Sequence, residues 1–111
     1  MQSMNNILAN NVHRQISYWI GDMFPNSVQR NIRMNNNYGV SMLLPQNRLN
    51  ATNCQIMNCT ETGLFRVTVS EFRRNDGGQS ESTLLFERRD VEDCEVESVL
   101  IEVQQLLKIN S

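Results

Sequence analysis

Hydrophobic residues recur at steps of three and four near both ends of the chain, a spacing that places them on one face of a helix. In the N-terminal part, the apolar positions are Leu8, Val12, Ile16, Trp19, Ile20 and Met23. Asn5 or Asn6 can cap the start of this helix, and Pro25 ends it because proline cannot continue the hydrogen-bond ladder. The pattern predicts a helix over residues 6–23.

The C-terminal part repeats this pattern and adds apolar residues outside the stripe. The stripe consists of Val96, Val99, Leu100, Val103, Leu106 and Leu107. Asp90 and Asp93 precede it, and we expect them to cap the helix and to face its positive end. Ile101 and Ile109 lie off the stripe, which favours burial against a second surface, either a core that wraps around the helix or a partner. We predict that Ile101, Leu107 and Ile109 bind a protein partner or a second copy of the chain.

Between the two helices the hydrophobic period changes from 3.6 to 2, which is typical of strands. The segment LFRVTVSEFRRNDGGQSESTLLFER, residues 64–88, predicts a hairpin whose glycines supply the positive φ angles of the turn. In a hairpin centred on Asp76-Gly77, residues whose numbers sum to 153 face each other. This register pairs Val69 with Leu84, Val67 with Phe86 and Arg66 with Glu87.

A second hairpin is predicted upstream, around the run Asn35-Asn36-Asn37. Apolar and polar residues alternate in residues 27–35 and again in residues 38–44. A short helix after Pro25 is a competing interpretation, because Val28 and Ile32 are four residues apart. Residues 43–52 are predicted to form a loop, and residues 55–57 a short strand.

Together these elements predict an α+β fold for residues 1–111 as a single domain. The predicted order is an N-terminal helix, an antiparallel meander of four or five strands and a C-terminal helix, with both helices on one face of the sheet. No stretch has the length and apolarity of a membrane span, and the N-terminus lacks the pattern of a leader peptide. We therefore expect a cytoplasmic or otherwise intracellular protein without a membrane partner.

This order of elements resembles the layout of RWD-type domains and of the small acidic chaperones of bacterial secretion systems. Both groups act by presenting a binding surface, so the resemblance implies a binding role. It is a resemblance of layout, without shared signature residues.

The distribution of charge weighs against nucleic acid as the main partner. Residues 1–60 carry four arginines and one aspartate, whereas residues 61–111 carry six basic and eleven acidic side chains. The isoelectric point near 5.3 lies far below that of a typical nucleic-acid-binding domain. An alternative function nevertheless remains, in which Arg66, Arg73 and Arg88 on the outer sheet face contact nucleic acid or a small ligand.

The cysteines do not form a recognisable metal or disulfide pattern. Cys54 and Cys59 are an odd number of residues apart, so on one strand they would point to opposite faces, roughly 16 Å from each other. Only a turn at Asn58 could group them with Cys94 and His13 as a zinc site, and the paired C-x2-C spacing of strong zinc sites is missing. We predict no metal and no cofactor.

His13 is the single histidine, and no carboxylate lies at a neighbouring helical step to orient it as a base. We predict no catalytic residue. The expected function is that of a non-enzymatic protein-interaction module, such as an adaptor, a chaperone-like protein or a small inhibitor protein. Its partner would bind the C-terminal helix or a free edge of the sheet.

Overall fold

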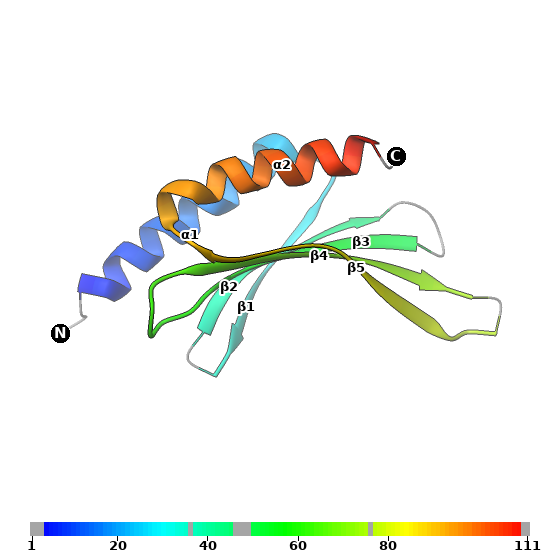
Figure 1. Ribbon diagram of the computed structural model, residues 1–111, viewed down its shortest axis with the longest axis horizontal. Helices are drawn as coiled ribbons and strands as arrows, with labels where there is room; N and C mark the ends of the chain where they lie inside the picture. Colours follow the sequence, from blue (N-terminus) through cyan, green and yellow to red (C-terminus); the bar gives the residue numbers. More distant parts are fainter. Residues whose placement is uncertain (1–3, 36, 46–49, 76, 110–111) are drawn as a thin grey trace.

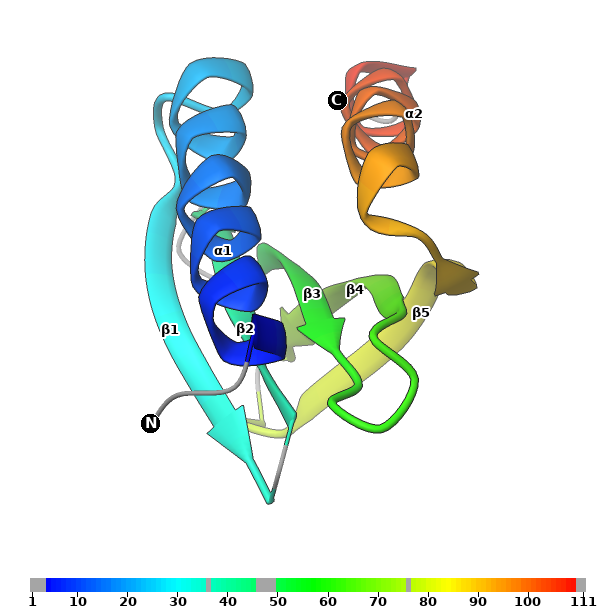
Figure 2. The same cartoon turned by 90° about the vertical axis from the view of Figure 1, so that its left-hand side faces the viewer.

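A five-stranded antiparallel sheet forms one layer of the protein, and two helices lie side by side on one face of it (Figures 1 and 2). The computed structural model describes residues 4–35, 37–45, 50–75 and 77–109, with side chains described for residues 14–35, 37–44, 51–75 and 77–107. The predicted α+β class, the terminal helices and the meander are confirmed.

Helix α1 (Met4–Met23) covers the part of the sheet formed by the first two strands (Figure 2). Ile16 and Ile20 are buried, as the helical period requires. The helix ends as predicted: the amide of Phe24 donates to the carbonyl of Ile20 at 2.8 Å, and Pro25 follows. A side chain from the first strand also holds α1, because Gln29 Nε2 donates to the carbonyl of Ser17 at 3.0 Å.

The strands follow one another in the sheet in the order of the sequence. They are β1 (Val28–Met34), β2 (Asn37–Pro45), β3 (Asn50–Asn58), β4 (Phe65–Arg74) and β5 (Ser80–Val91). The alternative of a helix after Pro25 is therefore wrong. The predicted loop over residues 43–52 is also wrong for residues 43–45 and 50–52, which are strand, and residues 46–49 lie outside the described part.

β3 extends over residues 50–58, whereas the pattern predicted a strand only at residues 55–57. The difference arises because the side chains that point into the core are not all apolar. Its buried side chains are Thr52, Cys54, Ile56 and Asn58, so two polar residues occupy core positions and hide the alternation. Burial of a polar side chain requires a hydrogen-bond partner. Asn58 meets this requirement, since its Nδ2 donates to the carbonyl of Gly63 at 3.2 Å.

The β4–β5 hairpin is present, but its predicted register is wrong. Arg74 pairs with Ser80, so an odd number of residues separates the strands, and a further register shift follows at Val69/Ser70. Val69 therefore faces Phe86, and Leu84 faces Ser70. The amide of Asn75 donates to the carbonyl of Gln79 at 2.9 Å and closes the longer loop. In the turn, Gly78 has a positive φ of 80°, whereas Gly77 does not, so the prediction holds for one of the two glycines.

The segment before the second helix also differs from the prediction. Asp90 does not cap a helix, because it lies within β5 with a φ of 55°. A short 3₁₀ helix, η1 (Asp93–Glu95), precedes α2 (Val96–Ile109). Asp93 is the first residue of η1, and its Oδ1 accepts a hydrogen bond from the amide of Cys94 at 2.8 Å.

The core lies between the sheet and the helices. It consists of Ile16, Ile20, Phe24, Val40, Met42, Cys54, Ile56, Phe65, Val67, Val69, Val91, Val96, Val99, Leu100 and Val103. β2 and β3 approach each other closely at Gly39, where a Cβ would overlap the carbonyl oxygen of Ile56 and lie 2.9 Å from the Cα of Met57. Any larger residue at position 39 would separate these central strands.

Candidate functional site

The sheet face that points away from the helices, here called the outer face, carries most of the exposed large apolar side chains. The described part of the chain has seven of these, namely Tyr18, Val28, Met34, Leu43, Phe72, Leu84 and Ile101. Strand alternation and pairing place five of them on the outer face: Val28, Met34, Leu43, Phe72 and Leu84. The helices cover only the opposite face, so nothing in the described chain buries these five residues.

The centre of the outer face is polar but uncharged. Its positions there are Ser41, Asn53, Gln55, Thr68 and Ser70. Ser41 Oγ donates to Asn53 Oδ1 at 2.8 Å, which links neighbouring strands. The centre of a protein interface is likewise depleted of charged residues, although on this face the apolar side chains lie toward the borders.

The size of the outer face can be compared with that of known interfaces. Strands about 4.8 Å apart and residues rising about 3.3 Å give the five strands a face of roughly 740 Å². A standard interface buries about 800 Å² per partner. The outer face alone is therefore slightly small, and a partner would need to reach one of its borders as well.

A cluster of ion pairs lies at the β4–β5 border of the outer face. Arg66 Nη2 is 2.6 Å from Glu87 Oε2, and Arg89 Nε is 3.1 Å from Glu87 Oε1. The hydrogen bond from Arg66 and the charge of Arg89 lower the pKa of Glu87. Because the folded protein lowers this pKa, the ionised Glu87 stabilises the fold at pH values above the ordinary pKa of a glutamate. This stabilisation is lost as the pH falls through the lowered pKa. The predicted pairing of Arg66 with Glu87 is thus kept as an ion pair, although the register differs.

The three arginines predicted to contact nucleic acid do not converge on one surface. Arg66 lies on the outer face, whereas Arg88 points to the helix side, where its Nη2 is 3.3 Å from Glu102 Oε1 and its guanidinium lies over the ring of Phe86. Arg73 forms an ion pair with Glu71. Since each of the three is paired with a carboxylate, they do not make an open basic patch.

The residues of the C-terminal helix that were predicted to bind a partner do not form one surface either. Ile101 is 40 % exposed, but Leu107 packs against the core. Six residues apart, these two side chains point about 120° away from each other around the helix. The side chain of Ile109 lies outside the described part. Ile101 therefore stands as a single exposed apolar residue, which is ordinary on a protein surface.

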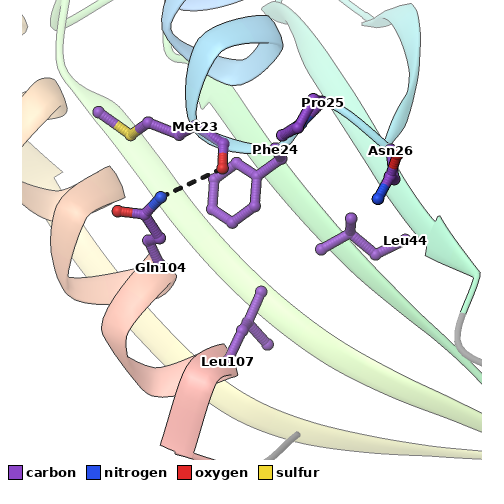
Figure 3. Close-up of a pocket in the computed structure, with 7 residues that line it drawn as sticks. All are labelled: Met23, Phe24, Pro25, Asn26, Leu44, Gln104 and Leu107. Atoms are coloured by element: carbon purple, nitrogen blue, oxygen red, sulfur yellow. Dashed lines mark hydrogen bonds between the residues drawn. The ribbon is translucent and has the colours of Figure 1, made fainter.

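Leu107 instead lines a hollow of about 380 Å³ where α1 ends (Figure 3). The lining consists of Met23, Phe24, Pro25, Asn26, Leu44, Gln104 and Leu107. Gln104 Nε2 donates to the carbonyl of Met23 at 3.1 Å and so ties the two helices together. None of the seven lining residues is an acid, a base or a nucleophile, so the hollow can hold an apolar group but cannot act on it chemically.

The cysteines are free and lie in three different environments. Burial raises the pKa of Cys54 to about 12. Hydrogen bonds from the hydroxyl and amide of Thr62 and from the amide of Glu61 lower the pKa of Cys59. Desolvation and the carboxylate of Glu92 raise the pKa of Cys94. Among the described residues no three metal-ligating side chains come together; the side chain of His13 lies outside them.

These environments predict a fixed order of alkylation by iodoacetamide in the native protein. Cys59 should react first, at a pH below that of an ordinary thiol, because its lowered pKa gives more thiolate there. Cys94 should follow at higher pH, and Cys54 should react only after denaturation. Peptide mass spectrometry across a pH series measures this order. Labelling of Cys54 at the rate of Cys94 in the native protein would contradict the buried position of Cys54.

The chain matches no family model, no curated protein and no solved structure. Within the part described by the structure, neither helix has both the length and the apolarity needed to cross a membrane.

The sequence did not reveal the outer face as the candidate site. The predicted hairpin register placed Leu84 opposite Val69, on the core side, whereas the structure turns it to the outer face. The four-residue spacing between Val28 and Ile32 indicated a competing helix and assigned Val28 to neither face of a sheet. The signal for the correct register was Gln79, which extends the turn and makes the loop odd in length.

Proposed function

We propose that the protein is a non-enzymatic protein-interaction module that docks a partner protein on its outer face. The observation that carries this proposal is that five of the seven exposed large apolar side chains of the described chain lie on the sheet face that the helices leave open. Covering them would remove apolar surface from water, which is the main favourable contribution to association.

A protein partner fits this face better than nucleic acid. A sheet that binds single strands usually stacks bases on two or three exposed aromatic rings. Among the exposed large apolar residues on the described outer face, Phe72 is the one aromatic, and Arg66 is already held by Glu87. An enzymatic role has less support. Cys94 Sγ donates to Glu92 Oε2 at 3.7 Å, but desolvation and the charge of Glu92 raise the pKa of this thiol and so disfavour the nucleophilic thiolate.

Site-specific photo-crosslinking tests the proposal. A benzophenone amino acid is introduced at Leu84 or at Leu43 on the outer face, and at Ile101 on α2 as a matched control of similar exposure. In cells that express the protein, we expect the two outer-face positions to give the same protein adduct, and the position of Ile101 to give none. The change Leu43→Lys should abolish the adduct formed from position 84, because it places a charge in the interface.

The alternatives give different products in the same experiment. Adducts from the position of Ile101 alone would return the binding site to the C-terminal helix and overturn the proposal. Adducts to nucleic acid from position 84 would establish the other candidate function. A thermal melt of each variant shows whether a lost adduct reflects lost folding.

A further inference from the structure

The two edges of the sheet differ in their ability to accept another strand. β1 pairs with β2 in one uninterrupted register, from Val28 opposite Leu43 to Met34 opposite Asn37. β5, at the other edge, has two register shifts against β4 and a positive φ at Asp90. Irregularities of this kind protect an edge from pairing, and β1 has none in its pairing with β2.

The charges at the two edges differ as well. On β5 and beside it, the arginines are matched by acids: Glu87 binds Arg66 and Arg89, and Glu102 binds Arg88. β1 carries Arg30 and Arg33 and no acidic residue. Within the described chain neither of these two arginines forms an ion pair, and both are exposed. The β1 edge is therefore positively charged without compensation.

Apolar residues on β1 complete the pattern. Val28 is 60 % and Met34 is 62 % exposed, the largest values among the aliphatic side chains of the described sheet. Pairing with β2 places both on the outer face, together with Arg30 and Ile32. A strand added beside β1 would extend the outer face by about 4.8 Å in width and cover part of these side chains.

We infer that an extended, acidic segment of the partner protein adds to β1 as a sixth strand. The segment has carboxylates beside Arg30 and Arg33 and apolar residues beside Val28, Ile32 and Met34. Backbone hydrogen bonds to the free edge provide affinity, and the alternating side chains provide specificity. The inference rests on the proposed role in protein interaction and names the chemistry of the partner.

A second copy of the chain fits this edge less well. If β1 paired with itself around Asn31, Arg30 of each copy would lie diagonally across from its equivalent on the same face, roughly 7 Å away. Like charges so arranged repel each other, and no acid on β1 offsets them. The charge of β1 thus selects an acidic partner over self-association.

A charge-swap experiment tests the inference. The probes are two labelled peptides as long as β1, Val-Glu-Val-Thr-Glu-Thr-Val and the same peptide with lysine in place of glutamate. We expect the acidic peptide to bind the native chain and to lose at least about tenfold in affinity to the double variant Arg30→Glu, Arg33→Glu. The lysine peptide should show the reverse preference. Fluorescence anisotropy at low and moderate salt measures both.

Two controls separate strand addition from simple attraction of charge. The double variant Arg74→Glu, Arg89→Glu has the same net charge, but its changes lie on β4 and β5, toward the opposite edge of the sheet, so it should bind the acidic peptide almost as the native chain does. N-methylation of alternate peptide amides should abolish binding for one of the two sets and spare the other, because only one set faces the β1 edge.

The remaining outcomes overturn the inference in distinguishable ways. Equal loss in both double variants would reduce the effect to net charge. Binding of neither peptide would show that the arginines only protect the edge from pairing. If the photo-adduct from position 84 persists in that case, the proposed function stands and the added strand does not. A dimer that the β1 variant dissociates would make a second copy the occupant instead.

Discussion

Replacing Gly39 with alanine is expected to destabilise the protein by at least about 3 kcal/mol, the upper part of the range for overpacked cores. The added Cβ would overlap the carbonyl oxygen of Ile56 and come within 2.9 Å of its carbonyl carbon. These are backbone atoms of the central strand, so no side-chain rotation can relieve the overlap. Either β2 and β3 separate at this point, or the variant does not fold.

Gly77→Ala provides the matched control for this prediction. The nearest atom to a Cβ at position 77 is Asn75 Oδ1 at 3.5 Å, an ordinary contact, and the backbone there is not in the left-handed region. Its effect should stay within about 0.5 kcal/mol. Urea denaturation followed by circular dichroism measures both variants. Similar midpoints for the two would show that β2 and β3 are not as close as described.

Leu100→Ala is expected to cost about 3 kcal/mol, because the Leu100 side chain is fully buried and its removal leaves a cavity beneath α2. The same change at the next residue, Ile101→Ala, should cost less than about 1 kcal/mol, since Ile101 is 40 % exposed. Both substitutions keep a good helix former in the same helix, so the difference reports burial and not helix propensity.

This pair also tests the orientation of α2. Rotation of the helix by one position about its axis would either bury Ile101 or expose Leu100, and in both cases the costs of the two substitutions would become similar. Chemical denaturation of both variants gives the difference directly, and a larger loss at position 101 than at position 100 would contradict the described packing.

The two helices were predictable because their apolar residues follow one period and their ends carry clear signals. The hairpins were predictable as elements for the same reason: Val67 and Val69 alternate with polar residues and flank a turn with two glycines. The start of α2 was less predictable. Asp90 has the residue type of a helix cap, but the pairing of Phe65 with Val91 keeps it in the sheet.

The faces of the strands could not be obtained from the pattern alone. One residue more in the β4–β5 loop changes the partner of every residue that follows, and a bulge changes it again. Thr52 and Asn58 occupy buried positions although they are polar, and Asn58 is satisfied there by a hydrogen bond to the carbonyl of Gly63, a contact that the sequence does not display. The candidate site was missed for this reason, since it depends on which side chains remain uncovered after the faces are assigned.

The unequal edges of the sheet also limit how large an assembly can grow. A strand that joins β1 becomes the new edge on that side, while the kinked backbone of β5 offers no regular row of amides on the other. A fibril of repeated chains would need both edges of every sheet, so the irregular β5 edge disfavours fibril growth through this sheet. Because each chain has one regular edge, we expect one segment per chain.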